Sequence, residues 1–125
     1  MAQNKRQTFG PVYVASAAGN LVAPAAAGAS AVGYTATATY ILINQIHLAN
    51  TDTGTTRTVV LYLGATGGSA GGTEIAPTIS IPPNSAVDLF FANGLRLEGT
   101  NGFLTGTASA ASKIVLTATG EVGLV

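Results

Sequence analysis

Alternating apolar and polar positions dominate the chain from residue 34 onward. Two apolar, β-branched runs, at residues 41–48 and 58–63, flank a polar connector that reads NTDTGTT. Apolar runs of this length, bounded by turn-forming residues, are typical of β-strands. We therefore expect residues 40–63 to form an antiparallel hairpin with a loop longer than two residues, and we expect the later strands to add to this pair.

Both strands of this predicted hairpin carry apolar residues on both faces. A two-residue period places Ile46 and Leu48 on one face of the first strand and Ile41 and Ile43 on the other. In the second strand, Tyr62 points away from the inward apolar set. A strand with one face in water does not need this pattern. We therefore expect the hairpin to serve as scaffold and also as a contact between subunits.

The rest of the chain predicts further short strands that are joined mainly by turns. Pro77 falls inside one of them, which places that strand at a sheet edge or a bulge. Asn93-Gly94 predicts a tight turn between two others. The expected strands are residues 34–40, 74–81, 86–91, 95–98, 103–107 and 113–119. About eight short strands without a long helix predict an all-β fold, an antiparallel β-sandwich of jelly-roll or Greek-key type, with an up-and-down barrel as the alternative.

Residues 1–33 depart from the alternating pattern. Most of residues 17–33 are Ala, Gly or Ser, and Pro24 together with several glycines interrupts any helix. Only residues 11–16 predict a short strand in this part of the chain. We therefore expect an extended N-terminal arm over residues 1–33 and a β-sandwich domain over residues 34–125.

Charge is scarce and balanced along the chain. Five Lys and Arg oppose five Asp and Glu, the formal net charge is zero, and only 8% of the residues are charged. A protein that binds nucleic acid needs several cations on one surface, so we expect no nucleic-acid partner. So few charges also give a free monomer little protection against association. We therefore expect copies of the chain, or a partner, to cover much of the surface.

The sequence also limits the compartment. No cysteine is present, which excludes disulfides, thiolate metal sites and redox motifs. No run of about 18 apolar residues occurs, so we expect no transmembrane helix and no membrane partner. Lys5 and Arg6 precede an Ala-rich stretch that superficially resembles a secretory signal, but glycines and prolines break each candidate apolar region. We therefore expect a protein that is made in the cytoplasm and keeps its N-terminus.

No set of residues in the sequence specifies a reaction or a cofactor. His47 is the only histidine, and without a second ligand or a nucleophile we expect it to be an ordinary strand-surface residue. The spacing of the carboxylates does not indicate a glycosidase pair. These carboxylates are Asp52, Glu74, Asp88, Glu98 and Glu121. We therefore expect no enzyme, no catalytic, cofactor-binding or metal-binding residues, and no cofactor.

Three further patterns have ordinary structural explanations. Residues 67–72, GGSAGG, resemble a phosphate-binding loop, but a strand is expected to follow and no lysine is present. Asp52 lies in a turn-forming loop, and one carboxylate is too few for a Ca²⁺ site. A sugar-binding platform is disfavoured because Trp is absent and Phe in a strand is normally a core residue. The aromatic residues considered for it are Tyr34, Tyr40, Tyr62, Phe90, Phe91 and Phe103.

Several turn-and-strand segments follow one another in a characteristic order. They read IHLANTDTGTTRTVVLYLG, GGSAGGTEI, IPPNSAVDLFF, LRLEGTNGFLTGTAS and KIVLTATGEV. In these segments, residues 34–122 resemble a group of small β-sandwich virion proteins of tailed bacteriophages. The resemblance does not extend to residues 1–33.

This resemblance implies a structural role in the virion and transfers no catalytic residue. It implies a capsid decoration (cement) protein that binds the outer surface of the assembled head and bridges capsid subunits. The alternative is a tail or fibre component that acts as a receptor- or glycan-binding module. The expected partners are the major capsid protein and further copies of the chain, as a homotrimer, with residues 1–33 contacting the head. The expected location is the virion, after synthesis in the bacterial cytoplasm.

Overall fold

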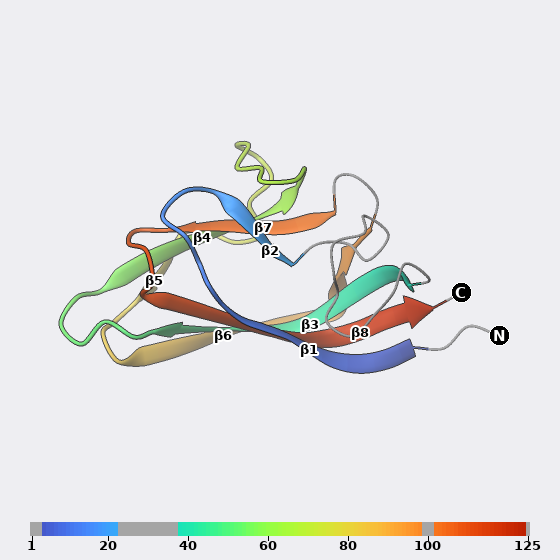
Figure 1. Ribbon diagram of the computed structural model, residues 1–125, viewed down its shortest axis with the longest axis horizontal. Coiled ribbons are helices and arrows are strands. Elements are labelled where there is room, and N and C mark those ends of the chain that lie inside the picture. The colour runs from blue at the N-terminus through green and yellow to red at the C-terminus, as the bar shows by residue number, and fades with distance from the viewer. Residues whose placement is uncertain (1–3, 23–37, 99–101, 125) are drawn as a thin grey trace.

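The computed structural model describes residues 4–22, 38–98 and 102–124, and these ranges contain strands and loops but no helix (Figure 1). The described residues contain no helix that is long and apolar enough to span a membrane. The strands are β1 (Asn4–Tyr13), β2 (Gly19–Val22), β3 (Ala38–Asn50), β4 (Arg57–Gly64), β5 (Ile79–Ile81), β6 (Ser85–Leu97), β7 (Phe103–Ala108) and β8 (Ile114–Leu124).

The strands form two antiparallel sheets that face each other (Figure 1). Sheet A has the order β1-β8-β3-β6, and sheet B has the order β2-β7-β4-β5. Along the chain, most consecutive strands alternate between the sheets instead of pairing with each other. An up-and-down barrel would pair consecutive strands, whereas this alternation is that of a jelly roll. The predicted all-β jelly-roll sandwich is therefore confirmed, and the barrel is excluded.

The core lies between the two sheets and draws on nearly every strand. Its fully buried side chains are aliphatic, as expected for alternating strands whose inner faces meet. The largest of them are Ile41, Ile43, Ile46, Leu48, Leu61, Ile81, Leu97, Leu104, Ile114 and Leu116. One continuous apolar layer thus joins the strands of both sheets.

The inner face of β3 contains two sets of residues that strict alternation would place on opposite faces of the strand. Ile41, Ile43, Ile46 and Leu48 are all fully buried. The pairing of β3 with β8 shifts by one residue between Ile43 and Gln45, so the strand contains a bulge. A bulge inserts one residue and reverses the alternation beyond it. The expectation that β3 has two apolar faces was therefore wrong, because both sets point into one core.

The predicted hairpin of residues 40–63 was also wrong. β3 belongs to sheet A and β4 to sheet B, so residues 51–56 cross from one sheet to the other. The buried Asn50 fixes this crossing, since its Nδ2 donates to the carbonyls of Thr55 at 3.0 Å, Ile81 at 2.9 Å and Pro82 at 3.2 Å. The apolar pattern located both strands, but it carries no information on which strands pair.

The N-terminal region is part of the sandwich, which corrects the predicted arm. β1 pairs with β8 and β2 pairs with β7, so residues 4–22 contribute to both sheets. Phe9, Val14 and Val22 are buried in the core. A register shift between Phe9 and Val12 accommodates Pro11 at the sheet edge, where a missing N–H is tolerated. The predicted boundary at residue 34 is therefore not a boundary of the fold, and residues 23–37 lie outside the described ranges.

Asn93-Gly94 does not separate two strands as the sequence predicts. β6 continues through it, with Ile43 opposite Leu95 and Gln45 opposite Phe90, so that residues 91–94 form an excursion facing one residue of β3. Gly94 has a positive φ of 77° there, which favours glycine. Asn93-Gly94 therefore belongs to a bulge inside β6 and does not form a turn between two strands.

Candidate functional site

The outer face of sheet A is formed by the four longest described strands. Cross-strand partners share a face, so the register defines which side chains point away from the core. We call these residues the sheet A face: Thr8, Tyr13, Gln45, His47, Ala49, Ala86, Asp88, Phe90, Val115, Thr117 and Thr119. In Figure 1 no described segment lies over this face, whereas the loop between β4 and β5 rises above sheet B.

A small polar cluster occupies the middle of the sheet A face. His47 and Asp88 are direct cross-strand partners, and His47 Nδ1 lies 2.7 Å from Asp88 Oδ1. Gln45 Nε2 donates to the same oxygen at 3.0 Å. The hydrogen bond with His47, followed by that from Gln45, lowers the pKa of the Asp88 carboxyl below its ordinary value. His47 therefore has a partner that sequence reasoning missed, because nothing in the sequence reveals the register of β3 against β6.

The carboxylates of Asp52 and Glu98 each bind an arginine, away from the His47–Asp88 pair. Asp52 Oδ2 accepts hydrogen bonds from Arg57 at 2.9 and 2.6 Å, and its Oδ1 accepts the Gly54 N–H at 3.1 Å. The Gly54 N–H, and then Arg57, lower the pKa of Asp52. Glu98 binds Arg96, whose guanidinium lies 4.0 Å from the centre of the Tyr40 ring. Within the described ranges, no three His, Asp or Glu side chains gather as metal ligands would.

The Gly-rich loop that contains residues 67–72 is anchored by hydrogen bonds. Gly67 N–H donates to Asn20 Oδ1 at 2.7 Å, and Asn20 Nδ2 donates to Thr66 at 3.0 Å. The hydroxyl of the buried Thr105 donates to the Gly68 carbonyl at 2.6 Å. A strand segment follows the loop, so the helix N-terminus that a phosphate-binding loop needs is absent from this described part of the chain.

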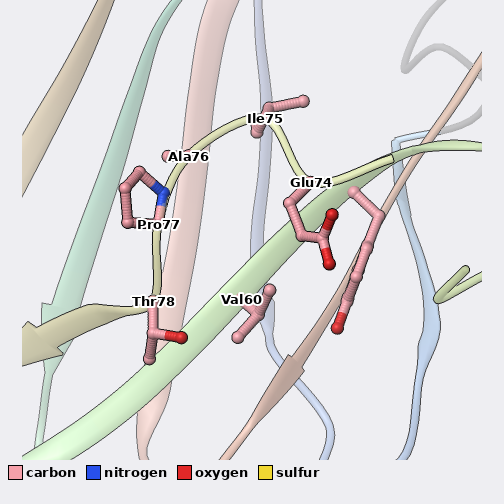
Figure 2. Close-up of a pocket in the computed structure, with 7 residues that line it drawn as sticks. Val60, Glu74, Ile75, Ala76, Pro77 and Thr78 are labelled. Atoms are coloured by element: carbon pink, nitrogen blue, oxygen red, sulfur yellow. The ribbon is translucent and has the colours of Figure 1, made fainter. Parts of the chain in front are cut away.

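A surface hollow lies along the edge of sheet B (Figure 2). Ile75 N–H donates to the Leu61 carbonyl at 3.0 Å, and residues 76–78 then bow outward before β5 pairs with β4. β5 is an edge strand, as predicted, but it covers only Ile79–Ile81. Pro77 therefore precedes this strand, although the sequence had predicted it inside the strand. We call this the β4 hollow, and its lining residues are Val60, Tyr62, Glu74, Ile75, Ala76, Pro77 and Thr78. The hollow contains the ring of Tyr62, the carboxylate of Glu74 and the hydroxyl of Thr78. The sequence did not predict that these three residues would lie together.

A second, smaller hollow lies at the β1 edge of the sheet A face. We call it the β1 hollow; it has a volume of about 190 Å³, and Pro11, Val12, Tyr13 and Val115 line it. Its lining is mainly apolar. Phe90 stands at the opposite edge of the same face, on β6, and is 73% exposed. The expectation that strand phenylalanines are core residues therefore holds for Phe103 but was wrong for Phe90.

Comparisons with known proteins identify the fold. No family model matches the chain, and no curated protein matches it in sequence. A solved structure of Desmodium yellow mottle tymovirus is similar, with a TM-score of 0.59 and 12% identity over 99% of this chain and 86% of that chain. A virus-like particle of the extra small virus of the giant freshwater prawn Macrobrachium rosenbergii is also similar, with a TM-score of 0.54 and 12% identity over 98% of this chain and 77% of that chain. The chain thus shares its jelly-roll fold with these two virus structures, neither of which is from a tailed bacteriophage.

Proposed function

We propose that this protein is a non-enzymatic structural component of a tailed-bacteriophage virion. In this role it is a capsid decoration protein that binds the outside of the assembled head as a homo-oligomer, with three copies as the expected number. The carrying observation is that viral capsid structures match the two-sheet jelly roll over nearly the whole chain. The phage origin and the decoration role rest on the resemblance of residues 34–122 to small phage virion proteins.

The charge of the chain favours the outer surface of a shell over contact with a packaged genome. Proteins that hold nucleic acid neutralise its phosphates with many Lys and Arg side chains. This chain has only five such residues and no net charge. The major capsid protein is therefore the proposed partner, and the proposed location is the virion surface.

Decoration stabilises a head through mass action. A protein that binds only the assembled lattice, and bridges neighbouring subunits, lowers the free energy of the assembled state relative to free subunits. The predicted contact through an arm of residues 1–33 needs revision, because β1 and β2 lie within this range and are part of the sandwich. The head contact is therefore assigned to the folded domain and its loops.

Reconstitution on heads that lack this protein tests the proposal. Purified protein is mixed with such heads, the heads are sedimented, and the bound copies are counted by quantitative mass spectrometry. We expect saturable binding at hundreds of copies per head and a higher temperature of head disruption. Binding to unassembled capsid subunits at the same affinity, or a handful of copies per virion, would contradict a decoration role. Deletion of residues 2–30 is unsuitable as a variant, because it removes two strands of the fold.

The β4 hollow favours a second candidate function, a receptor- or glycan-binding module of a tail or fibre. Tyr62 contributes an aromatic ring to its lining. Glu74 and Thr78 add polar groups that could bind sugar hydroxyls (Figure 2). In this case Tyr62→Ala should abolish adsorption of the purified protein to host cells. Thr53→Ala, an exposed change in the loop between β3 and β4 that touches neither hollow, is the control and should leave adsorption unchanged. Equal adsorption of both variants would count against this candidate.

A further inference from the structure

Two large hydrophobic side chains remain exposed among the described residues, and both belong to the sheet A face. Phe90 is 73% exposed and Tyr13 is 55% exposed. An aromatic side chain that stays in water forgoes the free energy of burying it. Single exposed apolar residues are common, but here the pair marks the two edges of one flat, uncovered surface.

The two edges are complementary in shape. Phe90 projects from β6, and the β1 hollow at the other edge is an apolar recess of about 190 Å³, comparable in size to an aromatic side chain. Phe90 cannot fill the hollow of its own chain, because β8 and β3 lie between β1 and β6. Three strand spacings separate the two edges by about 14 Å. A second molecule is needed to bring a phenylalanine to the hollow.

The charges between the two edges favour a second copy over other partners. Among the described outward side chains of sheet A, His47 contacts Asp88 at 2.7 Å and Arg96 contacts Glu98 at 3.0 Å, so cations and carboxylates are paired. Threonine, glutamine and alanine surround His47 and Asp88. Such a face offers no excess of cations to nucleic acid or to anionic lipid. Because His47 and Asp88 already contact each other, a second copy can cover this face without burying an isolated charge.

We propose that the sheet A face is the contact between copies of this chain, and that Phe90 of one copy occupies the β1 hollow of its neighbour. Each copy supplies both a projection and a recess, so a rotation axis can repeat the contact until the assembly closes. Burying an aromatic anchor in an apolar pocket is the arrangement that dominates the energetics of many protein interfaces. This inference rests on the homo-oligomer in the proposed function and identifies its surface.

Sedimentation equilibrium of the purified full chain tests this contact without heads. We expect the wild type to be oligomeric and Phe90→Ser to raise its dissociation constant by roughly 30-fold or more, as for loss of a buried anchor. Tyr62→Ser, which removes an aromatic side chain from the outer side of sheet B, is the matched control and should keep the wild-type assembly. Thermal unfolding of the dissociated Phe90→Ser chain reports whether its fold is intact.

A mixing experiment then distinguishes the proposed contact from a general loss of association. Phe90→Asp removes the projection but keeps the hollow, and Val115→Asp alters the hollow but keeps the projection. Each variant alone should be monomeric, while an equimolar mixture should form a mixed complex through the one intact projection–hollow contact. A monomeric wild type, an unchanged assembly of Phe90→Ser, or no mixed complex would overturn this inference. Head binding by a monomeric wild type would still leave the decoration role standing, so the two proposals fail separately.

Discussion

The two sheets of this jelly roll share one core, but they differ in how they present themselves to solvent. The sheet A strands have 10, 11, 13 and 13 residues, and no described segment covers the outer face that they form. The sheet B strands have 3, 4, 6 and 8 residues, and a long anchored loop rises above them. Long, regular strands with few charges make a flat surface suited to packing against another flat surface, whereas short strands serve to carry loops.

Enlarging one glycine on the inner side of each sheet tests whether the two sheets tolerate added volume differently. A Cβ on Gly120 of β8 would overlap the Leu42 carbonyl oxygen, and backbone there cannot move without opening sheet A. We expect Gly120→Ala to lower the free energy of unfolding by about 3 kcal/mol or more. Chemical denaturation monitored by circular dichroism measures this change.

Gly106 of β7 is the corresponding position in sheet B. Its added Cβ would lie 2.9 Å from a Leu21 methyl group and 3.0 Å from a Leu61 methyl group, and methyl groups can give way. Gly106→Ala should therefore cost about 1–3 kcal/mol. Gly54→Ala, with nothing within 4 Å, is the control and should change stability by less than about 1 kcal/mol. Equal losses at Gly120 and Gly106 would show that the long-stranded sheet is no more constrained than the other.

Asn50 offers a second test, because it links the two sheets. Its side chain is 2% exposed, and its amide donates to two carbonyls at the end of β5, those of Ile81 and Pro82. Asn50→Ala leaves these carbonyls without this donor and should lower the free energy of unfolding by about 1–3 kcal/mol. Thr53→Ala, an exposed change in the same crossing loop, should have almost no effect. A small loss at Asn50 would mean that the apolar core alone holds the sheets together.

The sequence predicted the strands well, but not which strands pair. The hydrophobic period identifies strands as local elements, and the all-β sandwich follows from their number and spacing. Pairing is decided by contacts between distant residues. The crossing fixed by Asn50 places the two strands of the predicted hairpin in opposite sheets. The bulge after Ile43 directs both apolar sets of β3 into one core. The short strand predicted over residues 11–16 overlaps only the end of β1, and β2 was missed. Gly10, Pro11 and the polar residues of β1 hide its period, although Phe9 is buried.

The candidate surfaces were less predictable than the fold. Phe90 lies 77 to 79 residues after Pro11, Val12 and Tyr13, which line the β1 hollow. Only the order of the strands in sheet A places Phe90 and this hollow at the two edges of one face. The same applies to His47 and Asp88, whose contact depends on a cross-strand register. The expectation of an apolar contact surface survives in the proposal for the sheet A face, but on different residues. Ile41 and Ile43, which suggested it, belong to the core.

The smallest expected effect concerns the polar centre of the sheet A face. His47→Ala removes the hydrogen bond that chiefly lowers the pKa of Asp88, so this pKa should rise toward its ordinary value of 3.8. Carboxyl-carbon NMR titration measures the change. Asp52 is an internal control, because the pKa of its carboxyl depends on Gly54 and Arg57 and should stay the same.

The lowered pKa of Asp88 also fixes the sign of the pH dependence. A carboxyl with a lower pKa in the folded than in the unfolded state stabilises the fold above its ordinary value of 3.8, and this contribution disappears as the pH falls through the folded-state pKa. The stability difference between wild type and His47→Ala should therefore shrink as a denaturation series goes from neutral pH toward pH values below that range. The effect should be small, because His47 and Asp88 are 46% and 38% exposed and solvent screens their interaction. A difference that grows in acid would mean that His47 stabilises sheet A by some contact other than the one with Asp88.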